Sequence, residues 1–489
     1  MRWRSIFICG TLLCILLVSS SLRAEAKMPR YHQHLMAEEK RPCTHDSALF
    51  CTHLPLVEIE TDDQAIPGKA ILEGNRKVGY TTAEDGSDRI EAHLKVIDNS
   101  GTNNHAADPP ALESDIIIHV RGNSSRRFDK SSYKIKLVGP DGKSNPQSMM
   151  GMDAHHEWVL HGPFLDKTLL RNYMWYNIAG EIMDYAPNVR FCEVLLNGEY
   201  QGLYVMLESI TAGENGARLP LSVEKKDNSY SGYLLCLDRA FAPSLQNANT
   251  FTKYAMRRKH DLEIVYPGAA NLTPELSQAI TQDFSAFEKA LYSYDYDDPD
   301  YGYRNFIDVD SFADYFILNE FTCNYDAGWL STYIYKDIDG KFKMCIWDFN
   351  SACDNYQAVQ VPDDGFEFQN DLWYVMLLKD EAFNKRLISR YHTLREGVLS
   401  DAYLENYIDD VVAYLGDAID RNYAVWGYTF GEEYDLLRPA QRNPRSYEDA
   451  IQNMKSFIVS RGARMDKDLE TILQYSAPSK VKKFNENAN

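Results

Sequence analysis

Short runs in which hydrophobic and polar residues alternate fill the first half of the chain and predict a series of β-strands. These runs lie at residues 54–60, 90–97, 116–120, 133–137, 191–196, 201–207, 232–238 and 262–266. The pair Asn197-Gly198 joins two of them and is typical of a tight hairpin turn. In the run that begins at Tyr133 the alternation is strict, which places Lys134 and Lys136 together on the face opposite the hydrophobic one.

The hydrophobic pattern changes to a helical period in the second half of the chain. One helix is predicted to begin at Asp310 as its N-cap, and another is predicted at residues 166–183 with Asp166 near its start. A β-rich part at about 53–270 is followed by a mainly helical part at about 271–475. This order predicts an α+β fold with two lobes and a cleft between them.

The two ends of the chain differ from its middle. Residues 1–26 combine a basic start, a long apolar run and small residues at the end, which predicts a signal peptide cleaved near Ala26 and an exported, secreted or cell-surface protein. The alternative is an uncleaved membrane anchor, because the apolar run approaches the length that spans a bilayer. No later stretch is long and apolar enough for that. Residues 27–52 are predicted to be a flexible leader and residues 476–489 a disordered tail.

The net charge limits the classes of partner that the chain can bind, and the cysteine spacing limits the disulfide bonds and metal sites that it can form. The formal net charge is −20, and nucleic acids and anionic lipids bind clustered Lys and Arg, so both are excluded as partners. Export permits disulfide bonds, and Cys43 and Cys51 are spaced for a short disulfide loop. No Cys or His spacing typical of a zinc site occurs. The sequence contains no signal that predicts the oligomeric state.

A predicted hairpin in the second half contains the candidate chemistry. Two strand-like segments flank Asp339-Gly340, and a turn at this point brings Asp326 beside Asp348. Two neighbouring carboxylates repel each other unless a cation lies between them, and a divalent metal with a phosphoryl group fits that gap. The alternative is that both aspartates are turn and cap residues. A helix, an Asp-bearing loop, a hairpin and a second Asp also follow one another in the catalytic segment of protein kinases.

Four motifs in order resemble the CotH family, the atypical kinases similar to spore coat protein H. The first is the segment 121–136, which begins Arg-Gly-Asn-Ser-Ser, and the second is the segment 165–172. The third is the segment 193–208, and the last consists of Asn324-Tyr-Asp326 together with Trp347-Asp-Phe-Asn350. Together the motifs span most of the chain after the predicted leader.

The resemblance implies a kinase-like fold that binds ATP and Mg²⁺ and phosphorylates serine or threonine hydroxyls of a protein substrate. It assigns the catalytic aspartate to Asp326 and the metal-binding aspartate to Asp348. These roles agree with the chemistry, because phosphoryl transfer needs one carboxylate to accept or orient the hydroxyl proton and another to hold the metal.

The first motif contains the candidate phosphate ligands. Arg121, Gly122 and Ser124 lie in a polar bend after a predicted strand, where backbone N–H groups can bind phosphate. The same residues are equally typical of a plain turn. Lys134 or Lys136 is expected to neutralise phosphate charge as a kinase strand lysine does. The alternative is that both lysines lie on a solvent-facing strand edge.

The sequence allows two different roles for each of two further polar residues. Glu208 ends a predicted strand where a kinase-like hinge begins, so it either contacts the nucleotide or caps the next segment. Arg171 lies on the predicted helix that would cover the site, and its alternative role is a structural ion pair.

The sequence departs from the family pattern at two positions. Ser331 stands where the family has Asn, and Asn350 stands where it has Asp. Both residues can ligate a metal through a neutral oxygen, but more weakly than a carboxylate, which puts a second metal and full activity in doubt. The alternative function is therefore a non-catalytic secreted, coat or surface protein that uses the fold as a binding module.

Overall fold

The computed structural model describes residues 29–37, 50–212, 218–219, 221–222, 231–239, 247–255, 260–361, 365–371 and 373–477. The chain divides into residues 1–31 and the unit from His32 onward, and all elements named below belong to that unit. The predicted signal peptide lies outside the described residues, as do Cys43 and nearly all of the predicted tail. None of the described helices is both long enough and apolar enough to span a membrane.

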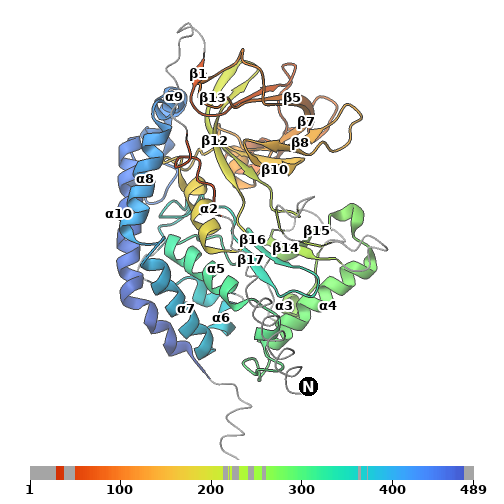
Figure 1. The fold of residues 1–489 in the computed structure, drawn as a ribbon, viewed down its shortest axis with the longest axis vertical. Helices are drawn as coiled ribbons and strands as arrows, with labels where there is room; N and C mark the ends of the chain where they lie inside the picture. The colour runs from red at the N-terminus through yellow and green to blue at the C-terminus, as the bar shows by residue number, and fades with distance from the viewer. Residues whose placement is uncertain are drawn as a thin grey trace, which may run out of the picture. The chain divides into compact units, whose positions relative to one another are not determined.

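The β-rich first half forms a closed barrel with the strand order β11-β13-β12-β2-β5-β7-β8. The strands are β2 (Leu56–Glu60), β5 (Ile90–Ile97), β7 (Leu112–Val120), β8 (Tyr133–Val138), β11 (Glu157–His161), β12 (Val189–Leu196) and β13 (Glu199–Glu208). Alternate side chains such as Leu94, Ile116 and Ile135 fill its interior and are fully buried. The alternation in the sequence therefore predicts the inward face correctly, and Figure 1 shows the barrel in orange and yellow.

Shorter strands lie outside the barrel. They are β1 (Cys51–Thr52) with β6 (Asn104–His105), β3 (Ala70–Glu73) with β4 (Arg76–Tyr80), and β9 (Gln147–Met149) with β10 (Met152–His155). The hydrophobic pattern does not predict these pairs, because β3 and β4 bury almost none of their side chains and the others are only two to four residues long.

A second, four-stranded sheet has the order β15-β14-β16-β17. Its strands are β14 (Tyr233–Asp238), β15 (Asp261–Tyr266), β16 (Thr332–Lys336) and β17 (Lys343–Cys345). The last two form the predicted hairpin, with Tyr333 opposite Cys345 and Tyr335 opposite Lys343. Asp339 has a positive φ of 56° in the turn, as the Asp-Gly pair predicts. The hairpin prediction is confirmed.

Helices, most of them after residue 270, cover the four-stranded sheet and one side of the barrel. The helices are α2 (Arg171–Ile182), α3 (Phe251–Ala255), α4 (Pro274–Leu291), α5 (Val309–Thr322), α6 (Tyr374–Leu377), α7 (Glu381–Arg395), α8 (Asp401–Leu415), α9 (Asp417–Trp426) and α10 (Tyr447–Asp468). Helix α9 packs on β13, and α5 lies between α7, α10 and β17. The mixed α+β composition, β-rich first and helical later, agrees with the prediction.

Two predicted helix starts are wrong. Helix α5 is capped by Asp308, whose carboxylate accepts a hydrogen bond from the Ser311 N–H at 3.0 Å, whereas Asp310 lies in the first turn and pairs with Arg386. Helix α2 begins at Arg171 and not near Asp166. The Asp166 carboxylate instead accepts hydrogen bonds within a tight loop that precedes the helix, including one from the Arg171 N–H at 2.8 Å.

Part of the predicted leader is packed on the fold. His32, Gln33 and His34 are buried, with exposed fractions of 7%, 7% and 9%. The Gln33 side chain forms two hydrogen bonds with the Phe191 backbone of β12, at 2.7 and 3.1 Å. The His34 ring is 2.9 Å from the Tyr173 hydroxyl. Composition alone places these polar residues in a flexible segment, whereas long-range hydrogen bonds satisfy them in the folded chain.

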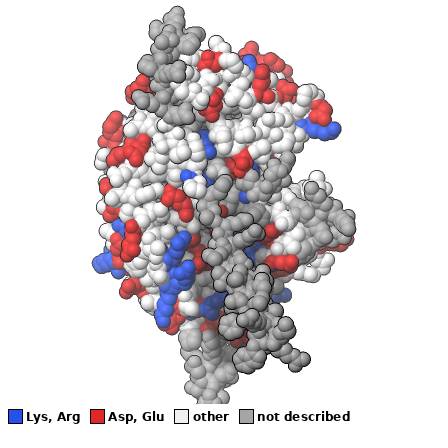
Figure 2. Space-filling view, in the orientation of Figure 1, with Lys and Arg blue, Asp and Glu red and all other residues white. Residues whose placement is uncertain are grey.

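Acidic side chains are spread over the face shown in Figure 2, and Lys and Arg are gathered at fewer places. This distribution agrees with the formal net charge of −20.

Candidate functional site

A cavity of about 470 Å³ lies between the barrel and the four-stranded sheet. The barrel side contributes the bend after β7 and the end of β11, and the sheet side contributes the ends of β14 and β16 and the loop after β17. The cavity is lined by the predicted site residues Arg121, Gly122, Ser124, Asp326, Ser331, Asp348 and Asn350. Residues more than 200 positions apart in the sequence therefore meet at one place.

Asp348 is held in a defined conformation at the end of the hairpin. Its backbone has a positive φ of 57°, and its N–H donates a hydrogen bond to the Tyr176 hydroxyl of α2 at 3.0 Å. Asn350 donates a side-chain hydrogen bond to the Asp348 carboxylate at 2.5 Å. Burial raises the pKa of Asp348, and the positive charge of Arg121 and the hydrogen bonds from Asn350 oppose that rise. The carboxylate is thus pre-positioned beside a cation.

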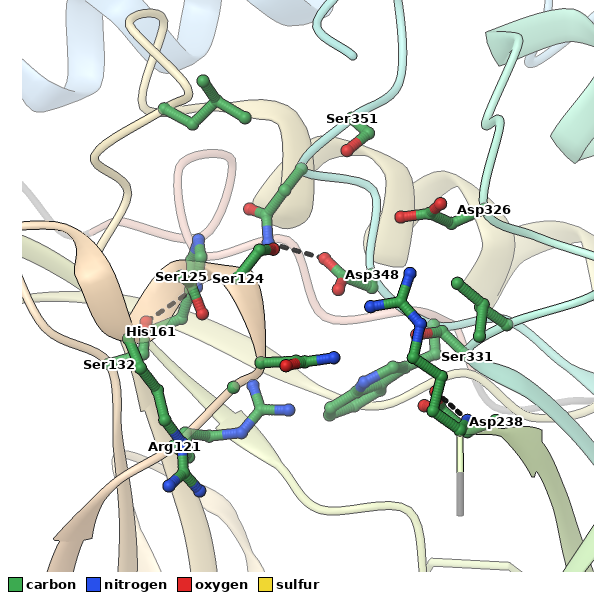
Figure 3. A pocket seen from close by; sticks show the side chains of 18 of the residues that line it. Arg121, Ser124, Ser125, Ser132, His161, Asp238, Asp326, Ser331, Asp348 and Ser351 are labelled. Carbon is green, nitrogen blue, oxygen red and sulfur yellow. Dashed lines mark hydrogen bonds between the residues drawn. The ribbon is translucent and has the colours of Figure 1, made fainter. Parts of the chain in front are cut away.

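Asp326 lies in the loop after α5 and faces the same part of the cavity as Asp348 (Figure 3). Burial raises its pKa to about 6, the negative charge of Asp348 adds to the rise, and the positive charge of Arg239 opposes it. A carboxyl group of this pKa is ionised at neutral pH and is still a better proton acceptor than an ordinary aspartate.

The loop after Asp326 is tightly built. The Gly328 N–H donates to the Thr332 side-chain oxygen at 2.8 Å, and the Leu330 N–H donates to the Asp326 carbonyl at 2.8 Å. Ser331 has a positive φ of 49° and lines the cavity. The backbone hydrogen bonds fix Asp326 independently of its side chain, so the carboxylate remains available for chemistry.

The bend after β7 faces the two aspartates across the cavity. Ser124 and Ser125 lie on the opposite side from Asp326 and Asp348 in Figure 3. Gly122 has a positive φ of 108°, and a Cβ atom at this position would lie 2.0 Å from the Ser125 hydroxyl oxygen. The Arg121 guanidinium lies 5.5 Å from the centre of the Trp347 ring, which holds this cation at the cavity wall.

Three of the predicted ligands do not line this cavity. Lys134 and Lys136 lie on β8 opposite the residues that fill the barrel, and Lys134 is paired with Glu157 at 3.3 Å. Glu208 is fully buried, and its carboxylate accepts hydrogen bonds from the backbone and the side chain of Asn188 at 2.9 and 3.2 Å. It therefore caps the neighbouring segment. The sequence alone does not determine which face of β8 is exposed to solvent.

Arg171 forms a structural ion pair, which is the second of the two roles that the sequence leaves open for it. Its guanidinium pairs with Asp166 at 2.5 Å and donates hydrogen bonds to the carbonyls of Ala352 and Cys353 at 2.8 and 3.1 Å. It lies behind the loop that follows Asp348 and does not line the cavity.

Sequence reasoning misses several polar residues of the cavity, among them Asp238, Arg239 and His161. Asp238 ends β14, Arg239 follows it, and His161 ends β11. Burial, together with the charge of Arg121, lowers the pKa of His161 to about 3, so its ring is neutral and contributes no cation. None of the three belongs to a recognisable motif, because each is placed at the site only by the pairing of its strand.

The arrangement can hold one divalent cation of the magnesium type together with a phosphate ligand. No cluster of three or more His, Cys, Asp or Glu side chains with metal-binding geometry occurs among the residues that the structure describes. Mg²⁺ needs only one or two carboxylates when phosphate oxygens and water complete its shell. Asp348 supplies the carboxylate of that donor set, and Ser331 lines the same cavity with a neutral oxygen, whereas the Asn350 side chain points its NH₂ group to Asp348 and its oxygen to Asn172.

Comparison with known proteins agrees with this geometry. The model of the family described as "CotH kinase protein" matches residues 118–465, which is more than half of the chain. The chain is 23% identical over 327 residues to "Inner spore coat protein H" of Bacillus subtilis (strain 168), covering 60% of this chain and 81% of the relative. Since the family model covers both the bend after β7 and the two aspartates, the chain belongs to the CotH kinase protein family.

Proposed function

We propose that this protein is an exported, Mg²⁺-dependent protein kinase that transfers the γ-phosphate of ATP to serine or threonine hydroxyls of a protein substrate. The observation that supports it most strongly is that Asp326 and Asp348 face one cavity from the same end of a single hairpin, one before its first strand and one after its second. A half-buried pair of neighbouring carboxylates with raised pKa values is costly for folding unless a cation and its ligand use it, so a purely structural role explains the pair poorly.

Asp326 is proposed as the residue that accepts the proton of the attacking hydroxyl. Its pKa of about 6 keeps it ionised at neutral pH and matched to this task. Its loop is fixed by the Leu330 and Gly328 hydrogen bonds, so little reorganisation is needed when a substrate hydroxyl approaches.

Asp348 is proposed to hold the cation, assisted by Asn350. Asp348 would hold Mg²⁺, whose charge would offset the negative charge of the phosphates during transfer. The chain's own contribution is the fixed carboxylate orientation, which comes from the Tyr176 and Asn350 hydrogen bonds to Asp348. Arg121 supports the ionised form of Asp348 by its charge.

The bend after β7 is proposed to receive the phosphates of ATP. Gly122, with its positive φ of 108°, lets the backbone turn so closely that the Ser125 hydroxyl lies where a Cβ atom would be, which packs this bend tightly at the cavity wall. Arg121 and Arg239 are the cations of the cavity wall nearest the two carboxylates, since their charges act on the pKa values of Asp348 and Asp326. We place Arg121 with the phosphates.

The arrangement of the elements supports a kinase-like fold as part of the proposal. A β-rich part precedes a helical part, the cavity lies between them, and α5, the Asp326 loop, the hairpin and Asp348 follow in order. The same order of catalytic and metal-binding segments occurs in protein kinases. The name of the Bacillus subtilis relative places that protein in a spore coat. We extend a coat or surface location to this chain, together with cleavage near Ala26.

A non-catalytic coat or surface protein is the second candidate function. Asn350, in the position of a family carboxylate, donates its amide to Asp348 and so uses one carboxylate oxygen that a metal would need. Ser331 supplies only a neutral oxygen at the second position of departure. Weak metal binding would leave the cavity as a binding site without turnover.

Thermal unfolding with ATP, in the presence and absence of Mg²⁺, tests the metal site. We expect ATP to raise Tm only with Mg²⁺, and Asp348→Ala to abolish the rise, because a ligand that binds only the folded state stabilises it. The matched control is Asp153→Asn, an exposed carboxylate on β10 outside the cavity. An equal rise without Mg²⁺ would contradict the assignment of Asp348.

Incubation with labelled ATP and a serine-rich acceptor protein separates the two candidate functions. We expect the parent to transfer label and Asp326→Asn to lose about 10²–10⁴-fold in rate while keeping the Mg²⁺-dependent rise in Tm. A parent that binds ATP and a partner protein but transfers no label to any of a broad panel of acceptors would favour the binding module.

A further inference from the structure

A second cavity of about 380 Å³ lies behind the loop that follows Asp348. It is lined by the loop before α2, by residues 353–355 and 360, by the segment before α10 and by the first turns of α10, and we call it the α10 cavity. The 351–360 loop separates it from the first cavity, because Ser351, Tyr356, Gln357 and Ala358 line that one. It therefore belongs to a different site.

Three cations from two separate segments line the α10 cavity. They are Lys167, Arg171 and Arg442, and all three are at least half-buried. Among the described residues of the lining, Asp354 is the one acidic side chain, and it pairs with Arg442 at 2.8 Å, while Arg171 pairs with Asp166 at 2.5 Å. One positive charge, that of Lys167, is left without a counter-charge of this kind among the described residues, in a chain with a net charge of −20. A pocket of this volume and charge selects a small anion.

The cations have hydrogen-bonding capacity to spare. The Arg442 side chain is 5% exposed, and its Nε has no hydrogen-bond partner among the described residues. The Lys167 ammonium donates to the Phe164 carbonyl at 2.8 Å and has no ion-pair partner in the part of the chain that the structure describes. Burial lowers the pKa of Lys167 to about 7, and an anion beside it would restore its charge. A buried donor without an acceptor is costly, and an oxyanion removes that cost.

Two of these cations also hold the loop that separates the two cavities. Arg171 donates to the carbonyls of Ala352 and Cys353. Arg442 donates to the carbonyls of Asp354, Tyr356 and Val359 at 2.7, 3.0 and 3.0 Å. An anion bound to the two guanidinium groups would fix their positions and, through them, the loop whose other side lines the first cavity.

We infer that the α10 cavity binds a small tetrahedral oxyanion of the phosphate class between Lys167, Arg171 and Arg442, and that its binding orders the 352–359 loop. A tetrahedral oxyanion presents acceptors in several directions, which suits three donors that come from two segments. The inference goes beyond the proposed kinase activity and does not depend on it, since its test uses neither ATP nor transfer.

The test uses inorganic phosphate and surface variants at the mouth of the cavity. Asn453 lines the cavity from the exposed side of α10, so Asn453→Glu adds a repelling carboxylate without disturbing the core. Asn453→Gln is the neutral control, and Gln452→Glu adds the same charge at a neighbouring exposed residue that does not line the cavity. Arg121→Gln controls for phosphate bound in the first cavity.

We expect millimolar phosphate, against chloride of equal ionic strength, to raise Tm of the parent by about 1–3 °C. Phosphate should also slow amide hydrogen exchange of residues 352–359. Both effects should be lost in Asn453→Glu and kept in the three controls, and Lys167→Met should lose them if it folds. No effect in the parent, persistence of both effects in Asn453→Glu, or their loss in Arg121→Gln would overturn the inference.

Discussion

The Tyr176 hydroxyl accepts a hydrogen bond from the backbone N–H of Asp348 at 3.0 Å and thereby ties the candidate metal ligand to helix α2. The next residues of the same loop are held by the same helix, since the Asn172 side chain accepts from the Phe349 N–H at 2.9 Å and donates to the Asn350 side chain at 3.1 Å. A helix built from the second family motif therefore positions the last one.

Tyr176→Phe should weaken nucleotide binding more than it weakens the fold. The phenol is buried, and its loss leaves the Asp348 N–H without its acceptor, at a cost of about 1–3 kcal/mol. The left-handed φ of Asp348 also loses its support. We expect a severalfold rise in the Kd for Mg²⁺-ATP, measured by calorimetry.

Tyr391→Phe is the matched control for that substitution. Its buried hydroxyl contacts Asp466 at 2.7 Å between α7 and α10, far from the loop in sequence. It should lower Tm to a similar degree and leave the Kd for Mg²⁺-ATP unchanged. An equal change of Kd in both variants would show that Tyr176 acts through general stability alone.

Gly328 allows the loop after Asp326 to approach the segment before α6. Its φ is 90°, and a Cβ atom would lie 2.0 Å from the Asp371 carboxylate. Gly328→Ala should therefore displace the loop and reduce transfer activity at least tenfold, measured with labelled ATP. Gly86→Ala, where φ is 84° and no atom lies within 4 Å of the added Cβ, introduces the backbone strain without the clash. Activity that survives in Gly328→Ala as well as in Gly86→Ala would contradict this explanation.

The buried His34 should make the free energy of unfolding depend on pH. Burial, and secondarily the charge of His32, lower the pKa of His34 from 6.5 to about 4. The folded state thus binds the proton less readily than the unfolded state. The contribution of neutral His34 to the free energy of unfolding is present in full above pH about 6.5. It amounts to up to about 3 kcal/mol and is lost as pH falls towards 4.

His34→Asn should flatten this dependence between pH 6.5 and 4, measured by urea unfolding at a series of pH values. His392→Asn, an exposed histidine on α7, is the control and should leave the slope unchanged. Other buried histidines such as His161 retain part of the slope in both variants. Identical slopes for the parent and His34→Asn would exclude His34 as a contributor.

The sequence predicts the site best where a local signal determines the geometry. The Asp-Gly turn between β16 and β17 correctly predicts the pairing that brings Asp326 and Asp348 to one end of the hairpin. The alternation in β8 likewise predicts which residues fill the barrel, but not that Lys134 on the opposite face pairs with Glu157 instead of lining the cavity. Alternation distinguishes the two faces of a strand, but only the tertiary fold determines which residues each face contacts.

Other parts of the site cannot be predicted from local patterns. The segment Glu157–His161 is buried along almost its whole length and shows no alternation. The hydrophobic pattern therefore predicts neither β11 nor the place of His161 at its end. Arg239 reaches the cavity only because β14 pairs with both β15 and β16. The Gln33 contacts with Phe191 span more than 150 residues, and no local signal reports them.

The pH dependence of transfer tests whether Asp326 is the proton acceptor. Because burial raises its pKa to about 6, kcat/KM should fall as pH decreases through about 6, two pH units above an ordinary aspartate. The positive charge of Arg239 opposes that rise, so Arg239→Gln should move the acid limb to higher pH.

Arg127→Gln removes the same charge from an exposed residue outside the cavity and should leave the acid limb in place. Asp326→Glu, which keeps a carboxylate, should retain an acid limb at reduced rate, whereas Asp326→Asn should have none. An acid limb near pH 4 in the parent, or one that Arg239→Gln does not move, would mean that another group accepts the proton. Arg239 holds down the pKa of both Asp326 and Asp238 from inside the cavity, so a limb that moves in Arg239→Gln and is absent in Asp326→Asn identifies Asp326 as the proton acceptor.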